Sequence, residues 1–328
     1  MKIAVVGSGS FGTAVSYMLR VKGLDVSLWC HSESVAKEIN ANGRNPKHMC
    51  DCNLNGVVAS TSFASVFDNA EAVILATPSF AVADVTEKMA PFLPSDIPVL
   101  LLSKGIAADG SLLFETVANK VGNIDRVAVL SGPNHAEELA IGKFAGAVVA
   151  STSEETAKTL QQIVSNMNFR LYTSNDPIGV SLCGAVKNVI AIVCGCARGA
   201  NAGDNAISLL MTRGLAELAR LVTACGGDSL TCLGLAGVGD MNATCNSRHS
   251  RNGMFGEALA TEGCSFEEYE ASHHAVVEGA HAVVPLYKLA HEKGVEMPIT
   301  EAVYSILYEN AELEPTIYGL FTRSLKAE

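Results

Sequence analysis

A strand pattern, a glycine-rich turn and a helix pattern follow one another directly near residue 7, and this order constrains the fold more than any other feature. The β-branched run Lys2–Val6 leads into Gly7-Ser8-Gly9-Ser10-Phe11-Gly12, after which a helical pattern begins. In a GxGxxG turn the first glycine allows the tight turn, the second admits a pyrophosphate and the third lets helix pack on strand. The phosphates then lie on the amides at the helix N-terminus. The stretch therefore predicts a dinucleotide site that includes Gly7, Gly9 and Gly12.

Short strand patterns alternate with helical patterns as far as residue 172. The further strands that we expect are Asp25–Trp29, Val57–Ser60, Ala72–Ala76, Val99–Leu102, Val127–Leu130, Ala147–Ala150 and Phe169–Tyr172. Helical patterns lie between them, among them Ala81–Met89, Leu112–Val121 and Glu154–Met167. This alternation predicts a Rossmann-like α/β fold with a doubly wound, mostly parallel sheet. From Asp176 onward the strand signals stop, so we expect a dinucleotide-binding domain over residues 1–178 and an all-α substrate domain over residues 179–328.

The end of the second expected strand lacks the acidic residue that NAD-specific proteins usually place there to hold the ribose hydroxyls. Glu33 comes later, in the next expected helix, while His31 stands at the strand end and Arg44 lies downstream. His31 could donate a hydrogen bond to a 2′-phosphate, although an exposed residue at a helix start is an equally good interpretation. We therefore expect NADP or NAD as the cofactor, with NADPH used at least as well as NADH.

Two polar groups follow later strands of the expected sheet, where ligands of such sheets bind. Lys104 comes after one strand, and Ser131-Gly132-Pro133-Asn134 after the next. Lys104 could equally be an exposed lysine in a turn. Asn134, with Glu137 three residues later, has the pattern of a helix N-cap that forms a capping box, a role that can coexist with ligand binding.

The stretch Gly179–Ala197 is apolar, rich in small residues and carries one charge, Lys187. Its length approaches that of a membrane span, but Lys187 and Asn188 at its centre favour a core helix, so we expect no membrane span. Lysine is rarely fully buried without a partner or a function. Two interpretations stay open: a structural lysine that pairs with an acid or reaches water, and a lysine that transfers a proton.

Two further segments of the helical half carry polar residues. Asp240 ends a glycine-rich loop, where it could cap a helix or bind a ligand. Ser250, Arg251 and Asn252 are consecutive hydrogen-bond donors suited to an anion, although a solvated helix start would use the same residues.

Charge and cysteine content narrow the range of partners. The net charge of −11 argues against nucleic acid as a partner and means that an anionic substrate needs locally clustered donors. The ten cysteines include no pair of CxxC motifs, so we expect no metal site and free thiols in a reducing compartment. No apolar run of signal-peptide length precedes the first glycines, which favours the cytoplasm.

Taken together, these motifs resemble the bacterial type of the NAD(P)-dependent glycerol-3-phosphate dehydrogenase family. The matching blocks are GSGSFGTA, LLSKGI (101–106), SGPNHAEELA (131–140), GAVKNVIAI (184–192), TRGLAEL (212–218), LGLAGVGD (233–240), SRN (250–252), VVEG (276–279) and VEMPIT (295–300). The resemblance covers nearly the whole chain. It implies reversible conversion of dihydroxyacetone phosphate and sn-glycerol 3-phosphate, which supplies the glycerophospholipid backbone, by a cytoplasmic homodimer.

The resemblance also implies roles for single residues, with Lys187 as the proton donor and acceptor. The implied substrate-binding residues are Lys104, Gly132, Asn134, Lys187, Asp240, Ser250, Arg251 and Asn252. The implied cofactor contacts, beyond the glycines, are Ser10, Phe11, His31, Lys104, Ala136, Arg251, Val276 and Glu278. The chain departs from the family pattern at Asn134-His135, where many relatives have Thr-Phe, and in the loop from His48 to Asn53, which lacks a Leu-Pro pattern.

Two alternatives remain at this point. One is another two-domain hydroxyacid dehydrogenase, of the 3-hydroxyisobutyrate or 6-phosphogluconate type, since those enzymes share the strand–glycine–helix start and a helical second domain. The other is a non-catalytic NADP-binding protein.

Overall fold

The computed structural model describes residues 1–248, 250–273 and 275–324, which form two compact units. Unit 1 consists of Met1–Lys104 and Ser111–Ser181, and unit 2 of Gly105–Gly110 and Leu182–Glu328. The division lies inside helix α8 (Pro177–Gly199), whereas the sequence predicts it near the start of that helix. Each unit is described by itself.

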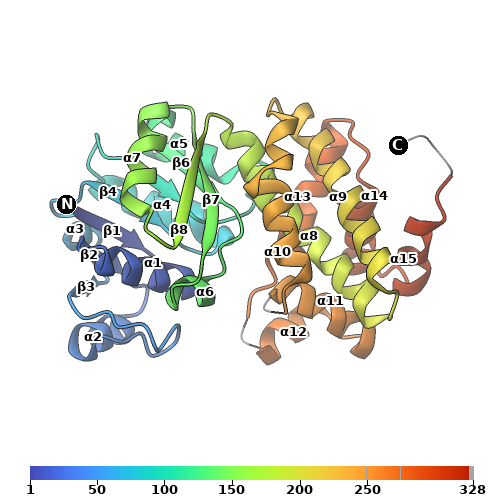
Figure 1. The fold of residues 1–328 in the computed structure, drawn as a ribbon, viewed down its shortest axis with the longest axis horizontal. Coiled ribbons are helices and arrows are strands. Elements are labelled where there is room, and N and C mark those ends of the chain that lie inside the picture. The colour runs from blue at the N-terminus through green and yellow to red at the C-terminus, as the bar shows by residue number, and fades with distance from the viewer. Residues whose placement is uncertain (249, 274, 325–328) are drawn as a thin grey trace. The chain divides into compact units, whose positions relative to one another are not determined.

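Unit 1 contains an eight-stranded sheet in the order β3-β2-β1-β4-β5-β6-β7-β8 (Figure 1). The strands are β1 (Lys2–Val6), β2 (Asp25–Trp29), β3 (Val57–Ser60), β4 (Ala72–Leu75), β5 (Val99–Leu101), β6 (Val127–Ser131), β7 (Ala145–Ser151) and β8 (Phe169–Ser174). Neighbouring strands are parallel except for β6 and β7, which are antiparallel. This topology confirms the predicted Rossmann-like sheet, and each strand ends within two residues of its predicted bounds.

The helices of unit 1 follow the predicted alternation with the strands. They are α1 (Ser10–Val21), α2 (Glu33–Asn42), α3 (Phe63–Phe67), α4 (Val82–Met89), α5 (Leu113–Val121), α6 (Ala136–Ala140) and α7 (Glu154–Val164), with 3₁₀ turns η1 (Ser79–Ala81), η2 (Ala90–Phe92) and η3 (Ile124–Arg126). The central strands β1 and β4 are apolar and fully buried from Ile3 to Val6 and from Ala72 to Leu75, as expected of strands covered on both faces. Helix α7 ends at Val164 instead of the predicted Met167, which is almost fully exposed.

The strand order places a topological switch point between β1 and β4. The chain moves outward from β1 to β2 and β3 on one side, and from β4 to β5 and β6 on the other. Because these six strands are parallel, their carboxyl ends share one edge of the sheet. Gly7, His31, Thr77, Lys104 and Gly132 follow the ends of five of them, at the edge where such sheets bind ligands.

The described part of unit 2 is helical, as predicted. Its helices are the greater part of α8, α9 (Asp204–Ala224), α10 (Asp240–Asn246), α11 (Arg251–Glu262), α12 (Phe266–His273), α13 (Glu278–Glu292), α14 (Pro298–Tyr308) and α15 (Leu313–Phe321), with a 3₁₀ helix η4 (Ser229–Leu233) and a π-helical turn η5 (Leu235–Gly239). Figure 1 shows α8 surrounded by the other helices of this unit. One described helix, α8, is long and apolar enough to cross a membrane, but 94% of its most apolar 18-residue window is buried within the protein, as in a core helix.

Glycines let the neighbouring helix α11 approach α8 closely. A Cβ atom at Gly195 would lie 2.1 Å from the Gly253 carbonyl oxygen, and one at Gly256 would lie 2.0 Å from the Ile192 carbonyl oxygen. Neither position has room for a larger residue without displacing backbone. The α8–α11 contact therefore depends on these small residues.

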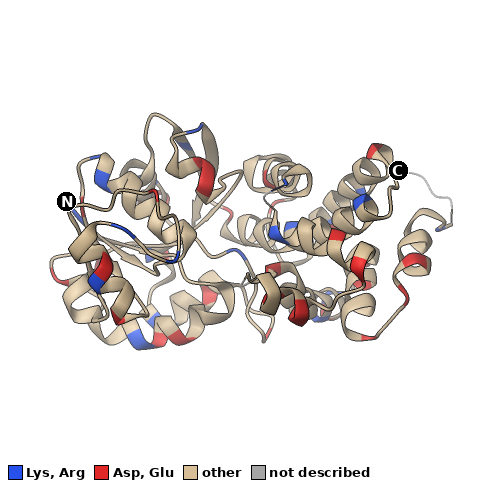
Figure 2. Ribbon diagram, turned by 90° about the horizontal axis from the view of Figure 1, so that it is seen from below, with Lys and Arg blue, Asp and Glu red and all other residues tan. Residues whose placement is uncertain are grey.

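Charged residues of both signs are mixed along the chain, although acidic residues are in excess. Figure 2 shows Asp and Glu interspersed with Lys and Arg on the ribbons of both units. The net charge is −11. An anionic ligand would therefore be held by local donors and not by the overall field of the protein.

Candidate active site

The glycine-rich turn of unit 1 separates into two structural glycines and one that borders open space. A Cβ at Gly7 would lie 2.7 Å from the Ala76 carbonyl oxygen, and one at Gly12 would lie 1.9 Å from the Gly7 carbonyl oxygen. A Cβ at Gly9 would meet no heavy atom within 4 Å other than those of its own chain neighbours. Helix α1 begins at the next residue, Ser10, and Gly9 at its N-cap offers no side-chain bond. The turn thus has the open backbone and free helix N-terminus that a dinucleotide pyrophosphate requires.

The end of β2 has the composition that the sequence indicates. His31 is exposed, and its ring centroid lies 6.2 Å from that of Trp29, which stacks on Phe63. Glu33 is the first residue of α2, and its carboxylate lies 2.8 Å from Lys37 Nζ. The strand end itself therefore carries no carboxylate that would repel a 2′-phosphate.

Three of the predicted ligands of unit 1 come together beyond β5 and β6. The Lys104 ammonium donates to the Gly132 carbonyl at 3.1 Å and to Asn134 Oδ1 at 3.0 Å. Asn134 is only 7% exposed, and its Nδ2 has no hydrogen-bond partner among the described residues. A buried amide donor without a partner costs free energy that a ligand acceptor would recover. This orphan donor indicates ligand binding beyond β6.

The predicted capping box at Asn134 and Glu137 is wrong. Helix α6 begins at Ala136, and the N-cap position is His135, which makes no side-chain cap bond. The Asn134 side chain lies one position too early to cap, and its oxygen is held by Lys104. Ala136, a predicted cofactor contact, is the buried first residue of α6.

In unit 2, Lys187 forms a buried ion pair. Its side chain is 7% exposed and its Nζ donates to Asp240 Oδ1 and Thr244 Oγ1, each at 2.8 Å. The Asp240 side chain is 3% exposed. Burying two charges is unfavourable unless the pair is well matched, and here the threonine hydroxyl adds a further acceptor. The described residues thus take up two of the three ammonium donors of Lys187.

This arrangement decides between the interpretations of Asp240. Helix α10 begins at Asp240 itself, directly after the π-helical turn η5, so Gly239 stands at the N-cap position. The interpretation of Asp240 as an N-cap is therefore wrong, because its carboxylate binds Lys187. Thr244 is a residue that sequence reasoning missed; its position four residues after Asp240, on the same helix face, is the signal that could have found it.

Two asparagines connect the helices around Lys187. Asn252 Nδ2 donates to Asn188 Oδ1 at 3.0 Å, and Asn252 Oδ1 accepts from the Gly279 backbone N–H at 2.8 Å. Asn188, also missed from the sequence, donates to the Gly184 carbonyl at 3.3 Å. The side chain of Asn252 thus joins α8, α11 and the start of α13.

The other predicted residues of unit 2 lie at helix starts. Ser250 is buried, and its hydroxyl oxygen caps α11 by accepting from the Gly253 N–H at 3.2 Å. Arg251 is the exposed first residue of α11, and Glu278 is the first residue of α13. Val276 is half-buried just before the fully buried Val277, whose N–H donates to Glu270 Oε1 at 2.7 Å.

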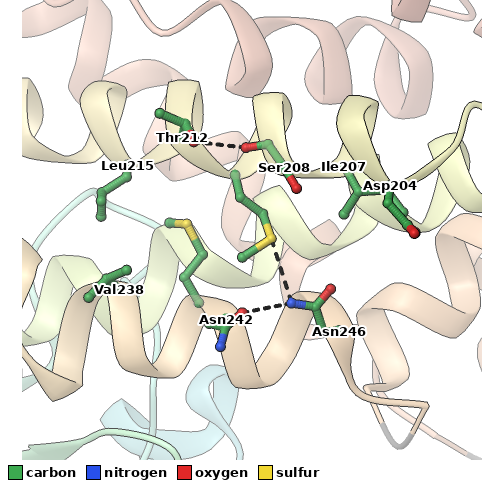
Figure 3. Close-up of a pocket in the computed structure, with 10 residues that line it drawn as sticks. Asp204, Ile207, Ser208, Thr212, Leu215, Val238, Asn242 and Asn246 are labelled. Carbon is green, nitrogen blue, oxygen red and sulfur yellow. Dashed lines mark hydrogen bonds between the residues drawn. The ribbon is translucent and has the colours of Figure 1, made fainter.

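A cavity of about 320 Å³ lies elsewhere in unit 2, between α9 and α10 (Figure 3). Its lining residues are Asp204, Ile207, Ser208, Met211, Thr212, Leu215, Val238, Met241, Asn242 and Asn246. None of these residues is basic, and Asn246 Nδ2 is bonded to Asn242 Oδ1 at 2.7 Å. The cavity therefore lacks the cationic donors that bind a phosphate most strongly.

Comparison with known proteins identifies relatives over both units. The family model for the N-terminus of NAD-dependent glycerol-3-phosphate dehydrogenases matches residues 2–157, and the model for the C-terminus matches residues 176–318. A glycerol-3-phosphate dehydrogenase [NAD(P)+] of Clostridium perfringens is 39% identical over 328 residues, which cover 100% of this chain and 99% of that protein. The corresponding protein of Corynebacterium kroppenstedtii is 40% identical over 335 residues and 99% of each chain.

A solved structure agrees with these relatives. The crystal structure of a glycerol-3-phosphate dehydrogenase from Coxiella burnetii is similar with a TM-score of 0.94 and 34% sequence identity. The match covers 98% of this chain and 99% of that one. Similarity therefore extends through both the sheet of unit 1 and the helices of unit 2.

Proposed function

Because the chain belongs to the NAD-dependent glycerol-3-phosphate dehydrogenase family, we propose that Lys187 transfers the proton in the reaction of this family. The protein is an oxidoreductase that uses NAD(P)H to reduce dihydroxyacetone phosphate to sn-glycerol 3-phosphate, the backbone of glycerophospholipids. Membership in this family supports this activity over both alternatives, a hydroxyacid dehydrogenase and a non-catalytic NADP-binding protein.

The observation that carries the proposed role is the buried Lys187–Asp240 pair. Reduction of a ketone creates an alkoxide, which needs a proton from a group within hydrogen-bond reach. Asp240 and Thr244 hold the Lys187 ammonium in one orientation, and one donor is left that no described residue takes up. That donor supplies the proton to the substrate oxygen, and in the reverse direction the Lys187 amine accepts it. When bound, the reduced nicotinamide supplies the hydride.

The proposed substrate-binding roles rest on one orphan donor, on two cationic side chains and on the resemblance to the family. In unit 1, the orphan Nδ2 of Asn134 is a donor to a substrate oxygen. The Lys104 ammonium, which holds Asn134 Oδ1 and the Gly132 carbonyl, places a positive charge beside it. In unit 2, the exposed Arg251 has a cationic guanidinium group that is suited to bind the substrate phosphate. Ser250, Asn252 and Asp240 are assigned to the proposed set by the resemblance to the family.

The cofactor-binding roles rest on the turn and on β2. The open backbone at Gly9 and the start of α1 at Ser10 and Phe11 support pyrophosphate binding there, with Gly7 and Gly12 shaping the turn. His31 and the absence of a carboxylate at the end of β2 support use of NADPH at least as well as NADH. Further contacts are assigned by resemblance to Lys104, Ala136, Arg251, Val276 and Glu278.

The setting of the enzyme is part of the proposal. All ten cysteines are free thiols in the structure, which supports a reducing compartment such as the cytoplasm. The resemblance supports a homodimer that takes a small phosphorylated substrate and works without nucleic acid or membrane partners.

An absorbance assay tests the proposed function directly. The purified protein should oxidise NADPH, and NADH no faster, when dihydroxyacetone phosphate is added, with the loss of the reduced-nicotinamide band as the readout. Oxo-acids that lack a phosphate serve as controls and should give no turnover. Turnover of the oxo-acids alone, or cofactor binding without turnover, would contradict the function, and a tenfold or greater preference for NADH would contradict the cofactor assignment.

A further inference from the structure

Asn45 is a fully buried polar side chain in the irregular segment between α2 and β3. Its Nδ2 donates to the Ser8 carbonyl at 2.8 Å and to Thr13 Oγ1 at 2.9 Å. Its Oδ1 accepts from the backbone N–H groups of Lys47 at 3.0 Å and His48 at 3.3 Å. Both polar atoms of the amide are therefore satisfied, with one bond to the glycine-rich turn, one to the first turns of α1 and two to its own segment.

The bond to Ser8 acts on the neighbouring amide of Gly9. The Ser8 carbonyl and the Gly9 N–H belong to the same peptide unit, which is planar and trans, so the two groups point in opposite directions. A side chain that fixes the direction of the carbonyl oxygen also fixes the direction of the N–H. The Gly9 N–H belongs to the turn that borders open space at the start of α1.

This peptide unit would otherwise rotate easily. Rotation of this unit changes ψ of Ser8 and φ of Gly9, and glycine imposes few limits on φ. Thr13 Oγ1 reaches the same carbonyl only at 3.4 Å, and that hydroxyl is itself held by Asn45. Asn45 thus makes the shorter of the two side-chain bonds that hold the carbonyl.

We propose that Asn45 is a positioning residue for the cofactor, which orients the Ser8–Gly9 peptide so that the Gly9 amide faces the dinucleotide pyrophosphate. This inference rests on the proposed binding of NAD(P)H at the glycine-rich turn. Asn45 touches no reacting atom; it acts through the Ser8–Gly9 peptide. Its loss should weaken cofactor binding and leave the chemical step unchanged at saturating cofactor.

The experiment compares Asn45→Ala with a matched asparagine. Asn40 also makes two bonds through its amide, to the carbonyl and the N–H of Ala59 at 2.8 Å each, and these bonds tie α2 to β3. Asn40 is more exposed than Asn45, but Asn40→Ala removes the same chemical group from the same region of unit 1 without touching the turn. For each variant we would measure the NADPH dissociation constant by fluorescence titration, KM for NADPH and for dihydroxyacetone phosphate, kcat and Tm.

Asn45→Ala should raise the dissociation constant and KM for NADPH about tenfold, as expected for loss of one oriented hydrogen bond, with kcat within about twofold of wild type. Asn40→Ala should lower Tm and leave the NADPH affinity unchanged. A lowered Tm with unchanged NADPH affinity in Asn45→Ala would overturn the positioning role. If Asn45→Ala does not fold, the isosteric Thr13→Val removes one acceptor of the Asn45 amide and should raise KM for NADPH two- to threefold, roughly; unchanged affinity in that variant would overturn the proposal equally.

Gly9→Ala separates this inference from the proposed function. A Cβ added at Gly9 has room in the structure, and the φ of Gly9, −71°, suits alanine. The variant should therefore keep its fold while the space for a pyrophosphate is reduced. Weaker NADPH binding in Gly9→Ala with normal binding in Asn45→Ala would overturn only the role of Asn45. Normal NADPH binding in Gly9→Ala would overturn the placement of the cofactor at the turn, and the role of Asn45 with it.

Discussion

Among the single side chains, Arg251 has the role that is easiest to isolate, because it is exposed and stands at the start of α11. Arg251→Ala should raise the activation free energy for dihydroxyacetone phosphate, measured from kcat/KM, by about 2–4 kcal/mol, the value of a charge-assisted contact to phosphate. The effect on dihydroxyacetone, which has no phosphate, should be much smaller. The measurement is kcat/KM for both substrates, with Arg248→Ala as the control for loss of a nearby exposed arginine. An equal loss for the two substrates would place Arg251 away from the phosphate.

The sequence predicts such residues only where the signal is local. Lys187 stands out because it is the one charge in a long apolar stretch, and Gly9 because the spacing of its turn is known. The pairing of Lys187 with Asp240 joins residues 53 positions apart, and the bond from Asn45 to Ser8 spans 37. The local pattern at Asn134 predicts a cap, whereas the contact that holds its side chain comes from Lys104 on a neighbouring strand end. No local pattern contains these partners.

Among the helices, α9 and α14 are joined by a buried carboxylate. Glu217 of α9 is 2% exposed and accepts from the Ile299 N–H at 2.8 Å and the Thr300 N–H at 3.4 Å, in the first turn of α14. Burial raises the pKa of Glu217 to about 7, although the two N–H groups and Arg220 act in the opposite direction and Glu301 adds to the rise. The carboxylate therefore provides a helix N-terminus with an acceptor at the cost of a buried charge.

This raised pKa predicts a specific pH dependence of stability. Between the ordinary value of about 4.5 and about 7, the folded protein keeps a proton on Glu217 that the unfolded chain has lost. The contribution of Glu217 to the free energy of unfolding is therefore greatest below about pH 4.5 and is lost as the pH rises through about 7. Glu217→Gln keeps an acceptor and removes the titration. The free energy of unfolding of Glu217→Gln, taken relative to that of the wild type, should therefore increase by roughly 1–3 kcal/mol from pH 5 to pH 8.

Denaturant unfolding at several pH values measures this difference, with the exposed Glu292→Gln as the control. The control should follow the wild-type profile. If the profiles of Glu217→Gln and wild type run parallel from pH 5 to pH 8, Glu217 does not titrate in this range.

Helix α8 makes a second prediction at this scale, through its thiols. Cys183, Cys194 and Cys196 are buried, and burial, with Cys194 nearby, raises the pKa of Cys196 to about 12. Because the thiolate is the reactive form, native α8 thiols should react with iodoacetamide far more slowly than the exposed Cys50. Mass spectrometry of the native and the unfolded protein would measure the labelling of each site. Native labelling of Cys196 as fast as that of Cys50, or a disulfide within α8, would contradict this packing.

For the whole molecule, the fold was largely predictable because its signals repeat. Eight strand patterns alternate with helices in unit 1, and apolar helices fill unit 2, so errors at single ends do not change the architecture. The sequence predicts a glycine-rich loop before Asp240 but not the π-helical turn η5 found there, since that turn depends on close packing in which a Cβ at Gly237 would lie 2.0 Å from the Cys232 carbonyl oxygen. The functional account likewise depends on contacts between distant segments, and above all on the pair between Lys187 and Asp240.

The most direct test of that account removes the ammonium and keeps a donor for Asp240. Replacement of Lys187 by methionine would take away the ammonium that pairs with the buried Asp240 carboxylate, which is strongly destabilising, whereas Lys187→Gln retains N–H groups and cannot deliver a proton. The measurement is kcat for dihydroxyacetone phosphate with NADPH, paired with NADPH affinity and Tm on the same protein. We expect kcat to fall by roughly 10² to 10⁴, with NADPH affinity within about twofold of wild type because the glycine-rich turn belongs to unit 1. A folded Lys187→Gln protein that turns over within tenfold of the wild-type rate would show that Lys187 has a structural role only.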